Sequence, residues 1–277
     1  MRLGGPLFQT HTDPAGWVAA LQAKGYRAAY CPVKPGASAA EVAAYRQAAA
    51  AANIVIAEVG AWSNPISSDP AERRAALDKC KAGLQLADEI GAACCVNIAG
   101  SAGSRWDGPH PDNLTGATFA RIVDSVREII DAVNPVRTFY ALETMPWIFP
   151  DSVASYDRLV RAIDRPRFAV HFDPVNLINC PERYFHNPAL IREFVAKLGP
   201  HIRSCHIKDI ALGQKLTVHL DEVRPGLGAL DYQTLLRELR GLEPDLPIML
   251  EHLPSAEEYD LAAQHVRAVA AQEGIDL

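Results

Sequence analysis

The pattern that most constrains the fold is an alternation of short apolar segments with longer amphipathic ones along the whole chain. The strand-like segments are residues 2–6, 27–31, 54–59, 93–98, 138–143, 168–173, 202–208 and 248–251. The helix-like segments are residues 14–24, 39–52, 71–90, 117–133, 152–163, 188–198, 232–239 and 256–271. Repeated strand-then-helix units favour a parallel sheet, and a chain of this length is typical of a closed barrel. We therefore predict a single-domain (β/α)₈ barrel over residues 1–277. The alternative is a doubly wound sheet, but no Gly-rich dinucleotide-binding pattern follows the first strand.

Capping signals mark several of the predicted helix boundaries. Asp13-Pro14 and Asp69-Pro70 each place a capping side chain before a proline that suits the first helical turn, and Ser255 is a third capping residue. Gly91 closes the third helical pattern. The sequence Asp173-Pro174, by contrast, follows an apolar run, and we interpret it as a strand end and a turn.

Composition restricts the partners of this chain. The formal net charge is −6 and the isoelectric point is about 5.8, which argues against a nucleic acid or an anionic membrane as partner. No stretch approaches the roughly 18 consecutive apolar residues of a transmembrane helix. The six cysteines include no CxxC spacing, which favours reduced thiols. We expect a cytoplasmic protein, and both a homodimer and a homotetramer stay open.

Polar residues stand where the predicted strands end. Glu58, Asn97, Glu143, Asp173, His206 with Lys208, and Glu251 hold these positions. The carboxyl ends of barrel strands are the place where such enzymes carry their catalytic groups. Each residue alone has an ordinary structural explanation, such as a turn or a surface ion pair. Four successive strands that each end on a metal-ligand type are much harder to explain in that way.

Glu143, Asp173, His206 and Glu251 form an oxygen-rich set of metal ligands. Three carboxylates and one imidazole suit a hard or borderline divalent ion, and we expect Mn²⁺, with Mg²⁺, Co²⁺ and Zn²⁺ as alternatives. Carboxylates that converge without a cation repel one another and tend to take up protons. The sequence therefore predicts one divalent metal ion at the mouth of the barrel.

Four short segments carry a family resemblance: YALET with Glu143, HFDPVN with Asp173, CHIKD with His206 and MLEHL with Glu251. Together with PGLGALDY they make the chain resemble the xylose-isomerase-like TIM barrels, in particular the sugar phosphate isomerase/epimerase group. The resemblance implies that these four residues bind one divalent metal and that the two glutamates exchange protons with substrate. Asn176 stands where many ketose epimerases and endonuclease IV-like members have a histidine, so a DNA-repair role is not expected.

The predicted chemistry is proton transfer beside a carbonyl group. We expect an isomerase or epimerase of a small ketose, inosose or related sugar that works through a metal-stabilised enediolate, with Glu143 and Glu251 as acid and base. Lys208 lies on the same strand face as His206 and is a third catalytic candidate, with a solvated rim charge as the alternative. A lyase of an oxo-sugar acid, decarboxylase or dehydratase, is the alternative function. A barrel that binds sugar without turnover fits the intact ligand set less well.

Six further residues are predicted to contact the carbohydrate substrate because they follow strand ends or lie in long loops. Residues 209–231 form the longest predicted loop, in which Arg224 is a candidate anion clamp and the glycines at 226 and 228 offer backbone N–H groups. The predicted substrate-binding residues are Asn176, Arg224, Glu58, Asn97, Trp62 and Trp147.

Overall fold

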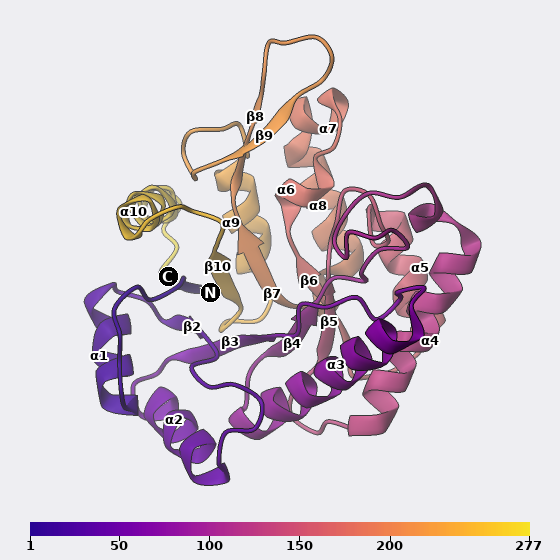
Figure 1. Ribbon diagram of the computed structural model, residues 1–277. Coiled ribbons are helices and arrows are strands. Elements are labelled where there is room, and N and C mark those ends of the chain that lie inside the picture. Colours follow the sequence, from indigo (N-terminus) through magenta and orange to yellow (C-terminus); the bar gives the residue numbers. More distant parts are fainter.

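Parallel strands close into a barrel in the order β1-β10-β7-β6-β5-β4-β3-β2 (Figure 1). The computed structural model describes residues 1–277. The barrel strands are β1 (Arg2–Gly4), β2 (Ala28–Tyr30), β3 (Val55–Gly60), β4 (Cys94–Asn97), β5 (Tyr140–Glu143), β6 (Phe168–Phe172), β7 (Ile202–Ile207) and β10 (Pro247–Leu250). The predicted (β/α)₈ barrel and each of its eight strands are confirmed.

A ring of helices surrounds the barrel. It consists of α1 (Pro14–Ala23), α2 (Ala39–Ala51), α3 (Pro70–Ile90), α4 (Gly116–Val133), α5 (Val153–Ile163), α8 (Asn187–Leu198), α9 (Tyr232–Arg240) and α10 (Ala256–Gln272), with short 3₁₀ turns η1 (Pro111–Leu114) and η2 (Gly199–His201). The predicted caps are present, since the side chains of Asp13, Asp69 and Ser255 accept hydrogen bonds from backbone N–H groups of the first turn. None of the helices combines the length and the apolarity that a membrane span requires.

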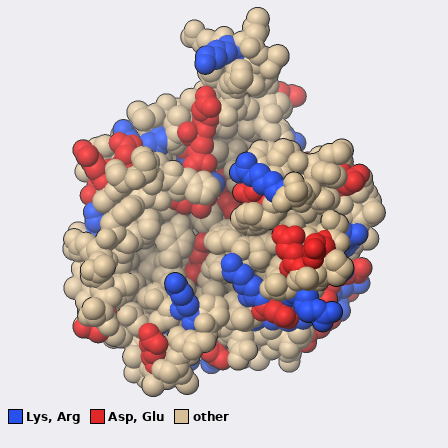
Figure 2. Space-filling model, in the orientation of Figure 1, with Lys and Arg blue, Asp and Glu red and all other residues tan.

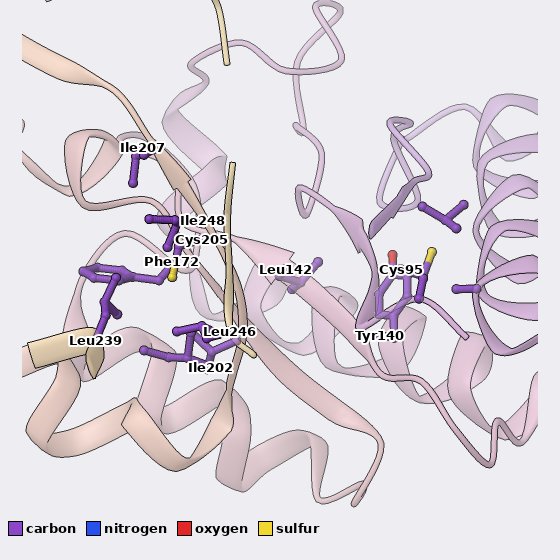
Figure 3. Packing of buried hydrophobic residues seen from close by; sticks show 14 of the residues in the cluster. Cys95, Tyr140, Leu142, Phe172, Ile202, Cys205, Ile207, Leu239, Leu246 and Ile248 are labelled. Atoms are coloured by element: carbon purple, nitrogen blue, oxygen red, sulfur yellow. The ribbon is translucent and has the colours of Figure 1, made fainter. Parts of the chain in front are cut away.

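The main hydrophobic core lies between the strands and the helices, outside the barrel lumen. Phe172, Cys205 and Ile248 come from three neighbouring strands and contribute to this layer (Figure 3). Phe172 stacks on Phe194 of α8 with ring centroids 4.0 Å apart. The lumen holds small residues instead, and a Cβ atom at Gly4 would clash with a backbone oxygen of β2. Polar side chains lie at the carboxyl ends of the strands, beyond this apolar part of the lumen.

Two segments after β6 and β7 differ from the prediction. Residues 209–223 were expected to be irregular loop, but β8 (Asp209–Leu212) and β9 (Leu220–Val223) form an antiparallel hairpin that projects beyond the barrel (Figure 1). Six of its eight strand residues are at least partly exposed, so the apolar alternation that reveals a half-buried strand is missing. After β6, Pro174 begins the short helix α6 (Pro174–Leu177) in place of a turn, and α7 (Pro181–Phe185) follows.

Candidate metal centre

The four predicted metal ligands meet at the carboxyl end of the barrel. Glu143 is the last residue of β5, Asp173 follows β6, His206 lies in β7, and Glu251 follows β10. One ligand atom from each residue lies within 4.8 Å of the others. Asp173 and His206 are fully buried, and the Glu251 side chain is 12% exposed. The structure thus brings the set together as expected, and its role in metal binding stays a prediction.

His206 is held between carboxylates on both sides of its ring. Its Nδ1 lies 2.9 Å from Glu143 Oε1 and 3.0 Å from Glu251 Oε1. Its Nε2 lies 3.1 Å from Glu58 Oε1 on β3. A metal-binding histidine commonly donates its second ring N–H to a carboxylate, which sets the tautomer and aims the lone pair of the other nitrogen at the metal. The contact with Glu58 therefore orients Nδ1 toward Glu143 and Glu251.

Both oxygens of Glu58 are occupied by protein groups. Besides His206, this buried carboxylate lies 3.0 Å from His171 Nε2 and accepts a hydrogen bond from Ser204 Oγ at 3.1 Å. Burial opposes ionisation, but the two histidines hold the pKa of Glu58 below its ordinary value. Glu58 borders the cavity at the site, and its contact with substrate stays a prediction. Its contacts make it a positioning residue for His206.

Lys208 is buried within the ligand set. Its side chain is 2% exposed, and its Nζ lies 2.7 Å from Asp173 Oδ2 and 2.5 Å from Glu251 Oε1. Burial disfavours the charge, but the surrounding carboxylates, Asp173 first, raise the pKa of Lys208 well above its ordinary value. The solvated rim charge that was the alternative for this residue is therefore excluded.

Asp173 uses its two oxygens for different purposes. Oδ1 accepts hydrogen bonds from the backbone N–H groups of Val175 (2.9 Å) and Asn176 (3.2 Å), which caps α6. Oδ2 points to Lys208. The same Asp-Pro combination starts α1 and α3, so the turn predicted at Asp173-Pro174 is a third capped helix start.

The residues present fit a divalent cation. Asp173 Oδ2 and Glu251 Oε1 are buried without a hydrogen-bond partner, and the close contact that they share is the ion pair with Lys208 Nζ, at 2.7 and 2.5 Å. Burial raises the pKa of Asp173 to about 7, and the charges of Glu143 and Glu251 add to this effect against the opposing charge of Lys208. With His206 neutral, as metal binding requires, one lysine does not balance three carboxylates. A divalent ion would supply the missing positive charge and would bind carboxylate oxygens of this kind.

A cavity of about 770 Å³ opens above this cluster. Figure 2 shows acidic atoms in the hollow below the β8–β9 hairpin. Trp62 and Trp147 line the cavity as predicted, together with Trp106. Asn176 also borders it, and its amide Nδ2 donates to Glu143 Oε1 at 3.3 Å. Asn176 thus holds the Glu143 carboxylate at the cavity wall.

Two predicted substrate contacts lie elsewhere. Asn97 is fully buried below the cavity-facing loops, where its amide exchanges hydrogen bonds with the backbone of Ser63. Arg224 pairs with Glu258 on α10 at 2.9 Å and does not line the cavity. Neither residue is supported as a substrate contact, because the partners of both side chains are in the protein itself.

The glycines of the PGLGALDY segment do not offer their N–H groups to an external anion. Gly226 N and Gly228 N donate to Asp209 Oδ2 at 2.9 and 3.1 Å, and Leu230 N donates to Oδ1 at 2.9 Å. A Cβ atom at Gly228 would clash with Asp209 Oδ1, so only glycine allows this approach. The anion that this loop binds is the buried carboxylate at the start of the hairpin.

Among the residues that line the cavity, sequence reasoning missed Glu222 and His252, which contact the charged cluster. Glu222 on β9 lies 3.8 Å from Lys208 Nζ and 3.2 Å from His252 Nδ1. His252 adopts a left-handed conformation with φ of 58°. The MLEHL motif contains His252 and could have indicated it. No sequence signal indicated Glu222, because the exposed hairpin lacks strand periodicity.

Fold and site together define a class: a (β/α)₈ barrel whose carboxyl end carries a buried carboxylate–histidine cluster suited to a metal. A family model described as xylose isomerase-like TIM barrel matches residues 18–269, and the chain therefore belongs to this family. A search of curated protein sequences found no match.

Solved structures share the fold over nearly the whole chain. Endonuclease IV from Thermus thermophilus has a TM-score of 0.73 at 16% identity, covering 98% of this chain and 100% of that one. D-psicose 3-epimerase with D-tagatose from Clostridium cellulolyticum H10 has a TM-score of 0.70 at 16% identity, with 100% of each chain covered. The probable 3-DHS dehydratase AsbF from Bacillus anthracis has a TM-score of 0.70 at 15% identity, covering 97% and 98%. At these identities the likeness concerns the fold.

Proposed function

We propose that this protein is a divalent-metal-dependent isomerase or epimerase of a small ketose, inosose or related sugar. The observation that carries the proposal is the pair of glutamates, Glu143 and Glu251, whose Oε1 atoms lie 2.9 and 3.0 Å from His206 Nδ1 and which both line a cavity of about 770 Å³. The epimerase with the same fold acts on sugars of this kind, as its name states. The net charge of −6 supports a small carbohydrate and not a nucleic acid as partner.

A divalent cation bound to Glu143, Asp173, His206 and Glu251 would supply a Lewis acid for a substrate carbonyl, and Mn²⁺ is the ion we propose. Glu143 ends β5 and Glu251 follows β10, two strands separated by β6 and β7 in the barrel order, so the two carboxylates can approach a bound sugar from different parts of the rim. Burial opposes their ionisation, but in the metal-free cluster the charge of His206 keeps the pKa of both below the ordinary value, and a bound cation would supply the positive charge once His206 is a neutral ligand. Both are therefore carboxylates at neutral pH, able to accept a proton from carbon and return it.

Lys208 and Asn176 position the two glutamates. The Lys208 ammonium lies 2.5 Å from Glu251 Oε1, and the Asn176 amide lies 3.3 Å from Glu143 Oε1. A buried ammonium in the same cluster also stabilises negative charge that develops on a substrate oxygen. Removal of a proton beside the carbonyl produces an enediolate, and return of the proton on the other face completes an epimerisation.

The alternative function is a lyase, decarboxylase or dehydratase, of an oxo-sugar acid. The buried charge of Lys208 favours it, because an ammonium in the cavity wall can anchor a substrate carboxylate. The similar fold of a probable dehydratase also supports a lyase function. The position of Arg224 outside the cavity weakens it, because a second anchor is lost.

Deuterium exchange tests the proposal. The purified protein, supplied with Mn²⁺, is incubated in D₂O with a panel of ketoses and inososes, and NMR is used to detect deuterium beside the carbonyl group. Exchange is expected with at least one substrate and is expected to be lost in Glu143→Gln and Glu251→Gln. Glu258→Gln, which changes a carboxylate outside the cavity, is the matched control. Loss of CO₂ or water without exchange would favour the lyase.

Metal analysis of the same variants tests the site itself. Elemental analysis of the purified protein is expected to find about one divalent ion per chain, with less in the two glutamine variants, because each removes a negatively charged ligand. Unchanged metal content and unchanged exchange in both variants would show that the site is assigned wrongly.

A further inference from the structure

The outer part of the cavity is not used by the proposed reaction. The cavity of about 770 Å³ falls in the range of roughly 300–1,000 Å³ that holds drug-sized ligands. The charged cluster of Glu143, His206, Lys208 and Glu251 lies at its inner end, at the mouth of the barrel, and Lys34, Arg105 and Asp107 also line the cavity. One sugar ring is smaller than a drug-sized ligand, so a sugar bound at the inner end leaves part of this volume free.

Aromatic side chains line the outer wall. Trp62, Trp106 and Trp147 lie in the loops that follow β3, β4 and β5, three neighbouring strands of the barrel. Met145 and Pro146 border the same wall. Each tryptophan thus comes from a different loop, although all three line one cavity. A wall of this kind matches a flat apolar group better than the hydroxyl groups of an open-chain sugar.

Two of the three tryptophan rings are held by the protein. A Cβ atom at Gly60 would lie 2.5 Å from Trp62 Nε1, so the ring of Trp62 packs directly on the strand backbone. Trp147 Nε1 donates a hydrogen bond to the backbone oxygen of Asp107 at 2.9 Å. Its polar atom is therefore satisfied while the residue stays 38% exposed. Rings that are already ordered lose little conformational entropy when a ligand binds.

Trp62 also connects the outer wall to the reacting groups. Its ring centroid lies 6.3 Å from that of His206, with the planes tilted by 39°. A sugar that contacts Glu143 and Glu251 therefore lies beside Trp62, in the cavity that Trp106 and Trp147 also line.

We propose that this wall is a subsite for a flat apolar substituent, so that the substrate class is an oxo-sugar carrying an aromatic group, such as an aryl glycoside. The inference rests on the proposed sugar chemistry and narrows its substrate class. The inner cluster recognises the sugar, and the tryptophan wall recognises the group attached to it. A free ketose has no apolar substituent, so it would not make apolar contacts with the tryptophan wall.

Matched pairs of glycosides test this subsite without requiring turnover. Phenyl and methyl β-D-glucopyranosides, with the corresponding galactoside and xyloside pairs, are titrated into the full-length protein loaded with Mn²⁺. Affinity is measured by isothermal titration calorimetry and by tryptophan fluorescence. We expect the phenyl member of at least one pair to bind tenfold or more tightly than the methyl member, with a change in tryptophan emission.

Variants of the wall localise the preference. Trp147→Ala and Trp106→Ala are expected to reduce the phenyl preference to less than threefold while methyl glycoside affinity is kept. Having two variants guards against one of them failing to fold. Phe185→Ala is the matched control, since Phe185 is 66% exposed on α7 and does not line the cavity. It is expected to leave the preference unchanged.

The outcomes separate the subsite from the reaction. If no pair shows a phenyl preference, or if the preference survives in both tryptophan variants, the subsite is refuted, whatever the deuterium exchange with free ketoses shows. If the preference is present but no oxo-sugar undergoes exchange, the subsite stands and the proposed isomerase chemistry fails.

Discussion

Replacement of Lys208 by methionine tests whether one buried cation stabilises the carboxylate cluster when metal is removed. Methionine keeps most of the volume of the side chain and removes the charge that lies 2.7 Å from Asp173 and 2.5 Å from Glu251. Removal of one partner from a buried ion pair costs about 3–5 kcal/mol, because the other charge is left uncompensated. At roughly 2–4 °C per kcal/mol for a chain of this size class, the melting temperature should fall by about 6–20 °C.

The effect of metal on the stability of Lys208→Met provides a second and more specific test. A divalent ion brings its own positive charge to the same carboxylates, so it should restore much of the stability that Lys208→Met loses. Differential scanning fluorimetry of the EDTA-treated and Mn²⁺-loaded proteins should therefore show a larger metal-induced increase in melting temperature for the variant than for the wild type.

A surface ion pair provides the control for this measurement. Lys81 lies 2.8 Å from Glu128, but both side chains are considerably exposed. Lys81→Met should therefore cost no more than about 1 kcal/mol, and metal should not compensate for it. The reasoning is refuted if EDTA-treated Lys208→Met has the same melting temperature as the EDTA-treated wild type. It is also refuted if metal raises the melting temperatures of Lys208→Met and the wild type by the same amount.

Three further predictions concern the surroundings of the cluster. Glu58→Gln should weaken Mn²⁺ binding about 10–100-fold in calorimetry, because His206 loses the carboxylate that sets its tautomer; unchanged affinity in the folded variant would contradict this. Burial raises the pKa of Asp173 to about 7, so the native state holds a proton that the unfolded chain releases near pH 4. The contribution of Asp173 to stability in EDTA should accordingly fall as pH rises from about 4 to about 7, and Mn²⁺ affinity should rise over the same window and level off above it; a pH-independent affinity would contradict this. Asp209→Ala leaves the buried N–H groups of its loop without an acceptor, which should cost at least about 1–3 kcal/mol in urea unfolding and expose residues 224–230 to protease; wild-type stability would show that the loop does not depend on this carboxylate.

The barrel and the ligand set were predictable because both depend on local pattern. Each strand is a short apolar run, and parallel strands in a barrel end at the same rim, so Glu143, Asp173, His206 and Glu251 converge once the fold is known. The β8–β9 hairpin was not predictable in this way. Its strands are stabilised by each other and by Asp209, and most of its side chains face solvent.

Contacts that cross the lumen depend on geometry that no local pattern contains. β3 and β7 are separated by β4, β5 and β6 in the barrel order, yet Glu58 on β3 reaches His206 Nε2 on β7. That distance depends on the barrel diameter and on the small residues that fill the lower lumen. The contacts of Lys208 could not be predicted from the local sequence either. Alternation places it on the face of His206, but only the structure shows that its side chain reaches Asp173 and Glu251 and leaves the solvent. Strand periodicity therefore predicts which groups face the site, whereas the partner that each group finds there is determined by the packing of the whole barrel.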